Sequence, residues 1–234
     1  MPDTEDLLTR LADRARTDPP WGWSAPPAPA DPGTLARAEE ALGFALPPLL
    51  AALYTRVADG GFGPEYGLLP LLEGSAGGEP PAVGQYLAAR ADPEWPWPAG
   101  VLQIAHWGCG MYACVDCTDE AAPVLLYEPN GGNPEYAWFS DSPSLARWLQ
   151  DWLDGTGWYD GDESDMDLPA WPDYAHRVRP PAATVPTPGK PAAGPWSPGD
   201  HRPGPGGPPA PSGPSAPPGP PARPPSYAAP RPSP

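Results

Sequence analysis

The chain has 234 residues, of which 44 are proline and 27 are glycine, a proportion that excludes a single ordinary globular domain. Its formal net charge of −16 argues against binding to nucleic acid or an anionic membrane and favours a basic protein partner. No apolar run is long enough to span a membrane, residues 1–16 lack the apolar core of a signal peptide, and the three cysteines do not suggest a disulfide framework, so we expect a cytoplasmic protein.

The prolines are concentrated at the C-terminus. Residues 180–234 contain 22 of them and almost no Leu, Ile, Val or Phe, so this tail is predicted to be disordered with polyproline character. The remaining residues suffice for one domain with a hydrophobic core. We therefore expect an N-terminal helix with a Pro- and Trp-rich connection (1–30), a folded domain (31–156), an acidic aromatic extension (157–179) and the proline-rich tail (180–234).

The first part of the folded region is predicted to be helical. Asp3 or Thr4 can cap a helix that continues through Ala15, and Asp31 followed by Pro32 begins a second helix that ends at Gly43. A third helix is expected over residues 46–58, with apolar side chains at helical spacing.

Residues 59–72, DGGFGPEYGLLPLL, are the stretch around which we expect the chain to be organised. Gly60 and Gly61 follow the last helical position, where a left-handed backbone ends a helix. Pro64 prevents further helix, and Tyr66 to Leu72 is predicted to be a strand. So many turn-forming glycines and prolines predict one defined backbone conformation at a helix-to-strand junction.

The second half alternates strands and turns. A short helix is expected at 83–91, an extended Pro- and Trp-rich loop at 93–98, and strands at 101–105, 111–117, 124–127 and 136–139. A hairpin-type turn is expected at 130–132, and a last helix is capped at Ser142 and stopped by Gly155. This order predicts an α+β fold, with a mainly antiparallel sheet and helices packed on one side.

Three motifs resemble the SUKH superfamily, the immunity-protein domain related to the fungal cell-wall-assembly regulator. They are the string from Leu42 to Leu71, the patch Trp107-Gly108-Cys109-Gly110 with Val115-Asp116-Cys117, and residues 127–132. The resemblance runs from about Leu35 to Leu153 and implies the same α+β fold. The positions expected to hold the turns of this fold are Gly43, Gly60, Gly61, Phe62, Gly63, Pro64, Gly67, Gly108 and Gly110.

One thiol-rich and one acidic segment have side chains of the types that bind metal ions. His106, Cys109, Cys114 and Cys117 are close enough in sequence to suggest zinc, but strand geometry would point Cys114 and Cys117 to opposite faces. Residues 160–167 lack the glycine and the final Glu that a calcium loop requires. With no nucleophile motif or phosphate loop either, we predict no metal, no cofactor and no enzymatic activity.

With these chemical functions set aside, the sequence favours a surface that binds another protein. Tryptophans and tyrosines are abundant and many lie in loops, where they either cover the sheet or anchor a partner. We expect the contacts to include Asp59, Glu65, Tyr66, Trp107, Asp116, Asp119 and Glu120, although Tyr66 and Trp107 could equally hold the glycine turns. The family resemblance implies an immunity protein that blocks a toxin domain, often a nuclease or deaminase; the alternative is a regulatory scaffold whose proline-rich tail recruits partners.

Overall fold

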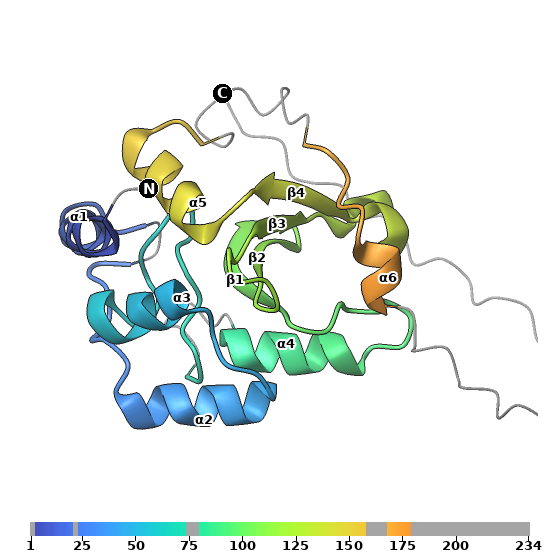
Figure 1. Ribbon diagram of the computed structural model, residues 1–234, viewed down its shortest axis with the longest axis horizontal. Coiled ribbons are helices and arrows are strands. Elements are labelled where there is room, and N and C mark those ends of the chain that lie inside the picture. Colours follow the sequence, from blue (N-terminus) through green and yellow to red (C-terminus); the bar gives the residue numbers. More distant parts are fainter. Residues whose placement is uncertain (1–2, 21–22, 74–79, 158–167, 179–234) are drawn as a thin grey trace, which may run out of the picture. The chain divides into compact units, whose positions relative to one another are not determined.

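The computed structural model describes residues 3–20, 23–73, 80–157 and 168–178 (Figure 1). The chain divides into two compact units, Met1–Thr184 and Val185–Pro234, and every described residue belongs to the first. The predicted proline-rich tail and the acidic segment 160–167 lie outside the described residues. The described part holds a four-stranded antiparallel sheet of order β1-β2-β3-β4 with helices packed against it, which confirms the predicted α+β class.

The first two helices begin and end where their caps predict. In α1 (Thr4–Thr17) the Asp3 carboxylate accepts a hydrogen bond from the N–H of Glu5, and in α2 (Pro32–Leu42) Asp31 accepts from Gly33 and Thr34. These bonds satisfy N–H groups that have no partner inside a helix. Gly43, at φ +79°, ends α2 in the left-handed region.

The third helix departs from a regular α-helix. It begins as α3 (Pro48–Ala52) and continues as one π-helical turn, η1 (Leu53–Val57), closed by a bond from the Ala58 N–H to the Leu53 carbonyl at 3.2 Å. The wider turn accompanies complete burial of Leu53 and Tyr54. The Tyr54 hydroxyl donates to the Leu69 carbonyl at 3.0 Å and ties this helix to the glycine-rich segment.

The segment 59–72 is a compact turn in which Phe62 is fully buried. Gly61 donates to the Leu68 carbonyl at 2.8 Å and Leu68 donates back to the Phe62 carbonyl. The predicted strand over 66–72 is wrong, because this segment forms an isolated bridge between Leu68 and Ala105 in place of a ladder. The backbone groups of Leu68 bond within the turn, and Pro70 has no N–H to offer a ladder.

The sheet places its strands close to the predicted positions. Its members are β1 (Val101–Gly108), β2 (Met111–Asp116), β3 (Val124–Tyr127) and β4 (Trp138–Ser142). The β3–β4 connection is not a hairpin-type turn, because it contains the two 3₁₀ turns η2 (Pro129–Gly131) and η3 (Pro134–Tyr136). The second of these occupies the residues predicted to begin β4, so the strand starts two residues later than expected.

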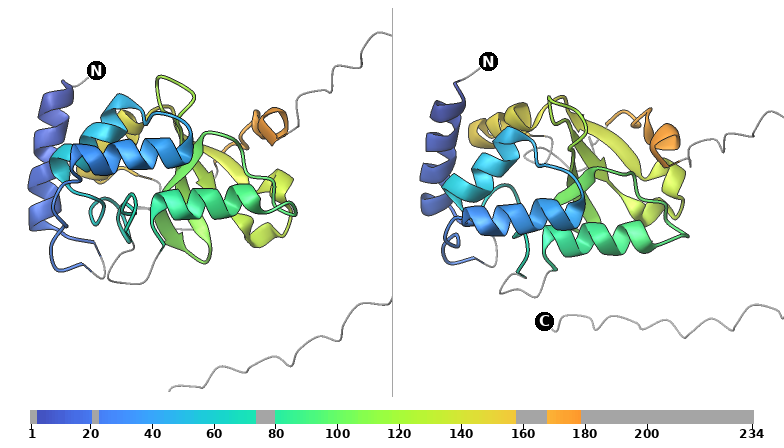
Figure 2. Two further views of the ribbon diagram at one scale, coloured as in Figure 1. Left: turned by 90° about the horizontal axis from the view of Figure 1, so that it is seen from below. Right: turned by 60° about the horizontal axis from the view of Figure 1, so that its bottom comes forward.

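Two of the remaining helices pack against the outer strands of the sheet. Helix α4 (Ala82–Ala91) packs against β1 and runs beside α2 in both views of Figure 2. Phe44, which follows α2, meets Tyr86 of α4 edge to face. Helix α5 (Leu145–Asp154) packs against β4; its N-cap is Ser144 and not the predicted Ser142. The short helix α6 (Tyr174–Val178) follows. The largest fully buried side chains include Trp148, Tyr54, Phe62, Leu50, Leu53, Leu68, Leu102, Ile104 and Leu125.

Candidate partner-binding surface

An aromatic row crosses one face of the sheet. The strand register places His106 opposite Tyr112, Tyr112 opposite Tyr127, and Tyr127 opposite Trp138. Residues directly opposite one another in antiparallel strands point to the same face, so these four rings form a line across the sheet. We call these four residues, together with Tyr66 at the β1 end, the aromatic row. His106, Tyr112 and Tyr127 are half-buried, and Trp138 is buried.

Tyr66 continues the row beyond the first strand. Its ring centroid lies 5.5 Å from that of His106, which in turn lies 5.1 Å from that of Tyr112. Tyr66 is 38 % exposed, so part of its ring faces solvent. A Cβ atom on Gly108 would lie 3.7 Å from this ring, an ordinary van der Waals contact, so glycine is favoured at this turn by its φ of +81° and not by the ring.

Trp107, also predicted as a contact, lies in the core. It is only 9 % exposed, and as the neighbour of His106 along the strand it points to the opposite face of the sheet. There its ring meets Trp148 of α5 edge to face, with centroids 6.4 Å apart. Of the two aromatic candidates, only Tyr66 has a ring accessible to a partner.

The Asp59 carboxylate is occupied within the fold. Its Oδ1 accepts a hydrogen bond from the N–H of Leu71 at 2.9 Å, which holds the two ends of the glycine-rich segment together. Burial raises the pKa of Asp59, the Leu71 bond opposes the rise, and the nearby Glu73 charge adds to it. A half-buried carboxylate with a structural hydrogen bond is poorly placed to contact a partner.

Asp116 is likewise engaged inside the chain. It is 5 % exposed and forms a bidentate ion pair with Arg177 of α6, at 2.8 and 3.0 Å, while its Oδ1 also accepts from Thr118. Burial alone would raise the pKa of Asp116, but the hydrogen bonds from Arg177 and Thr118 together lower it below its ordinary value. This pair fastens α6 to the end of β2.

The exposed acidic candidates are divided between the two ends of β2. Asp119 and Glu120 follow its C-terminal end, where the Asp119 carboxylate accepts from the N–H of Ala121. Glu65 sits in the glycine-rich turn beside Tyr66, at φ +51°, near the other end. A strand of this length spans about 17 Å. The structure therefore groups Glu65 and Tyr66 but does not bring Asp119 and Glu120 to them.

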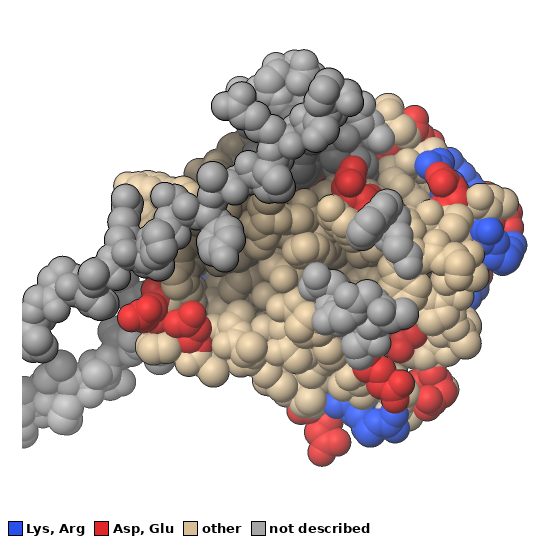
Figure 3. All heavy atoms as spheres, turned by 180° about the vertical axis from the view of Figure 1, so that it is seen from behind, with Lys and Arg blue, Asp and Glu red and all other residues tan. Residues whose placement is uncertain are grey.

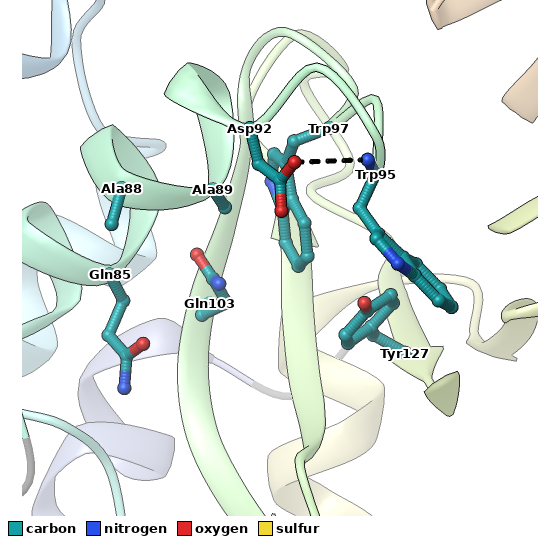
Figure 4. Close-up of a pocket in the computed structure, with 8 residues that line it drawn as sticks. All are labelled: Gln85, Ala88, Ala89, Asp92, Trp95, Trp97, Gln103 and Tyr127. Carbon is teal, nitrogen blue, oxygen red and sulfur yellow. Dashed lines mark hydrogen bonds between the residues drawn. The ribbon is translucent and has the colours of Figure 1, made fainter. Parts of the chain in front are cut away.

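A pocket of about 410 Å³ opens beside the Tyr127 part of the row (Figure 4). It is lined by Gln85, Ala88, Ala89, Asp92, Trp95, Trp97, Gln103 and Tyr127. In Figure 4 Gln103 and Asp92 lie toward α4, Trp95 and Tyr127 lie away from it, and Trp97 stands between them. Burial raises the pKa of Tyr127 to about 12. The pocket is linked to the row because Gln85 donates to the Tyr112 hydroxyl at 3.1 Å.

Sequence reasoning missed most of this surface. Tyr112 and Gln103 lie in strands without a motif, and Asp92 ends a helix. For Gln103 and Tyr112 the signal is the cross-strand register, which becomes visible only once the strands are paired, whereas Asp92 reaches the pocket through the packing of α4 against β1. The sequence raises His106 as a zinc ligand, an interpretation that strand geometry argues against, and the structure places it in the row. Among the described residues no three His, Cys, Asp or Glu side chains are grouped to hold a metal ion.

Most described arginines are neutralised by acidic neighbours, whereas several acidic side chains are not neutralised by a described basic one. Most of the described arginines are held in ion pairs, which are formed by Arg10, Arg14, Arg16, Arg56, Arg147 and Arg177. In the view from behind, basic side chains lie at the edges, each next to acidic ones, and the hollowed middle is largely uncharged (Figure 3). Glu65, Asp92 and Glu94 have no ion-pair partner within the described ranges, so their charges remain available.

Together, the antiparallel sheet, the aromatic row and the uncompensated acids define a small α+β domain with a surface suited to binding another protein. The family model of the SMI1/KNR4 family (SUKH-1) matches residues 29–151, more than half of the chain, and the chain belongs to this family. This confirms the resemblance carried by the glycine-rich motifs. No curated protein matches the chain in a sequence search. Within the described residues, no helix is long and apolar enough to cross a membrane.

Proposed function

We propose that the chain is a non-enzymatic immunity protein that neutralises a toxin domain of nuclease or deaminase type by binding it directly. The observation that carries the proposal is the aromatic row, in which Tyr66, His106, Tyr112 and Tyr127 keep part of their surface exposed on one face of the sheet. Tyrosine and tryptophan are common energetic anchors of protein interfaces, because they bury much area for little side-chain entropy. Membership of the SMI1/KNR4 family supports the same general role.

Charge complementarity supports a basic partner. A nuclease must be basic around its substrate groove, since the nucleic-acid backbone carries one negative charge per phosphate. The chain is strongly acidic, and ion pairs within the fold compensate most of its described arginines. An acidic surface beside exposed aromatic rings would speed association with such a groove and cover it.

The test begins with the full chain as bait in an extract of its source cells. A captured basic domain is then produced alone and assayed for toxicity and for catalytic activity with and without the chain. We expect stoichiometric inhibition that weakens as salt rises. Tyr66→Ala and His106→Ala should weaken it, whereas Tyr136→Ala should not, because Tyr136 is 72 % exposed but lies in η3, outside the row.

Two outcomes would contradict the proposal. If the Tyr66 and Tyr136 variants inhibit equally well, the aromatic row is not the contact surface. If a chain without residues 180–234 captures nothing while the full chain captures its partner, the proline-rich tail recruits that partner. The regulatory-scaffold role would then replace the immunity role.

A further inference from the structure

The pocket beside Tyr127 contains a buried acceptor that the fold does not satisfy. Gln103 is 3 % exposed, it lines the pocket, and its Oε1 has no hydrogen-bond donor in the described part of the chain. A buried carbonyl oxygen without a donor destabilises a folded protein, so such groups are rare. A ligand that brings an N–H or O–H group into the pocket would supply the missing donor.

The walls of the pocket are aromatic rings held in fixed orientations. Trp97 donates its Nε1–H to the Val101 carbonyl at 2.7 Å, and its ring packs against Tyr127 with centroids 4.8 Å apart. Trp95 meets Tyr127 edge to face from the outer side, at 6.4 Å. Indole and phenol faces carry the negative part of the ring quadrupole and therefore attract cations.

The pocket also has a net negative charge. Asp92 lines it, and the Oδ1 of this carboxylate accepts from the N–H of Glu94 at 2.8 Å. It also accepts from the N–H of Trp95 at 3.3 Å, the bond marked in Figure 4. These bonds fix the carboxylate and leave its Oδ2 available. The nearest arginine along the chain, Arg90, donates to the Trp97 carbonyl and is not among the lining residues. No Lys or Arg side chain of the described chain lines this pocket, so its charge is uncompensated from within.

We propose that this pocket receives the guanidinium group of an arginine side chain that projects from the protein partner. The assignment of the arginine to a partner rests on the proposed function; the pocket's preference for a guanidinium does not. A guanidinium is flat, so it can lie against Trp95 or Tyr127, and its fork of five N–H donors can supply both Gln103 and Asp92. An ammonium group is compact and strongly hydrated, and it matches the slot between rings less well.

The test uses the full chain and a small probe, N-acetyl-arginine methylamide, followed by NMR on the indole N–H signals of Trp95 and Trp97. The matched probes are the citrulline derivative, which has the same shape without the charge, and the lysine derivative. We expect saturable shifts with a dissociation constant on the order of 1–10 mM for the arginine probe, and binding at least about tenfold weaker for the other two.

Two substitutions separate the contributions of the pocket residues. Gln103→Leu removes the buried acceptor while keeping its volume, so it should abolish arginine binding and leave stability unchanged or raised. Asp92→Asn retains the oxygen that accepts from Glu94 and Trp95 but removes the charge, and should weaken binding severalfold. Glu128→Gln is the matched control, since Glu128 is not among the lining residues and its carboxylate accepts from Asn130.

Three results would overturn the proposal: no saturable shift at Trp95 or Trp97, equal binding of the citrulline or lysine probe, or full binding by the Gln103→Leu variant. None of them requires a toxin, so a negative result leaves the proposed immunity function standing. Conversely, if the probe binds and no toxin is ever inhibited, the arginine pocket remains and the immunity function fails.

Discussion

Two glycines with the same backbone angle provide a direct test of the rigidity of the segment 59–72. Gly60 and Gly43 both have φ +79°, so alanine is strained at either position. At Gly43 an added Cβ would meet no atom within 4 Å. At Gly60 it would lie 2.6 Å from the backbone nitrogen of Pro70 and 2.7 Å from the Leu68 carbonyl oxygen, distances that real Cβ atoms do not show.

The magnitudes can be worked out from these contacts. A left-handed alanine costs about 1–2 kcal/mol, partly offset by the smaller entropy of the unfolded chain, so Gly43→Ala should lower the free energy of unfolding by about 1 kcal/mol. Gly60→Ala adds a clash with backbone that cannot rotate away, because Leu68 is hydrogen-bonded to Gly61 and Phe62. Forcing such atoms apart costs about 1–3 kcal/mol more.

The assay is urea unfolding of the full chain at neutral pH, followed by tryptophan fluorescence. With a slope of about 1–3 kcal/mol per molar urea, the additional loss in Gly60→Ala should lower the midpoint by roughly 1 M relative to Gly43→Ala. The slopes of the two variants should agree, so that the midpoints can be compared. Equal midpoints would refute the reasoning, because the segment would then give way to the added methyl group at little cost.

Substitutions at three further residues test individual side chains of the fold. Asp116→Asn should lower stability by about 1–3 kcal/mol at pH 7; because the folded pKa of Asp116 is lowered, the difference from wild type should shrink as the pH falls below about 4, which acid titration of unfolding will show. The pH dependence at Asp59 should be the opposite, because its folded pKa is raised. Asp59→Asn should be at least as stable as wild type at pH 7, and wild type should become more stable relative to this variant as the pH falls through the raised pKa. Asp59→Ala, which lacks the acceptor for the Leu71 N–H, should be about 1 kcal/mol less stable than wild type. Tyr54→Phe leaves the Leu69 carbonyl without its hydroxyl donor in the core and should cost about 1–2 kcal/mol in the same urea assay, whereas an unchanged midpoint would mean that this bond is not needed.

The parts of the fold that could be predicted are those decided within a few residues. Asp3 and Asp31 cap their helices as expected, and Gly155 ends the last one, because a cap depends only on the side chain and the next turn of backbone. The strand predicted over 66–72 failed for a reason outside that range. The backbone groups of Leu68 bond within the glycine turn, while the Leu69 N–H donates to the Ile104 carbonyl of β1. An apolar pattern does not reveal which of these partners a backbone group takes.

The candidate surface depended on contacts between distant parts of the chain. From the sequence, Asp116 is expected to be free to contact a partner, because Arg177, which pairs with it, lies 61 residues away along the chain. His106, Tyr112 and Tyr127 belong to three strands, and they form a row only through the register. Predicting such a row requires the pairing of strands and their bulges, since a shift of one residue would send each ring to the opposite face.

The residues that identify the family and the residues of the proposed contact surface overlap only in part, because Tyr66 and Tyr127 belong to both. Gly60, Gly63 and Gly67 carry the resemblance, and an added Cβ at each would approach its neighbours to within 2.5–2.7 Å, so their role is to let the chain pass through a crowded turn. Gln103 and Asp92 lie outside the motifs, and neither has a positive φ that would restrict the residue type. We infer that the constrained glycines convey the fold and that the choice of partner is made by the side chains around them, in the aromatic row and its pocket. One scaffold can present different contact surfaces in this way, because exchanging the side chains of the row leaves the constrained glycines unchanged.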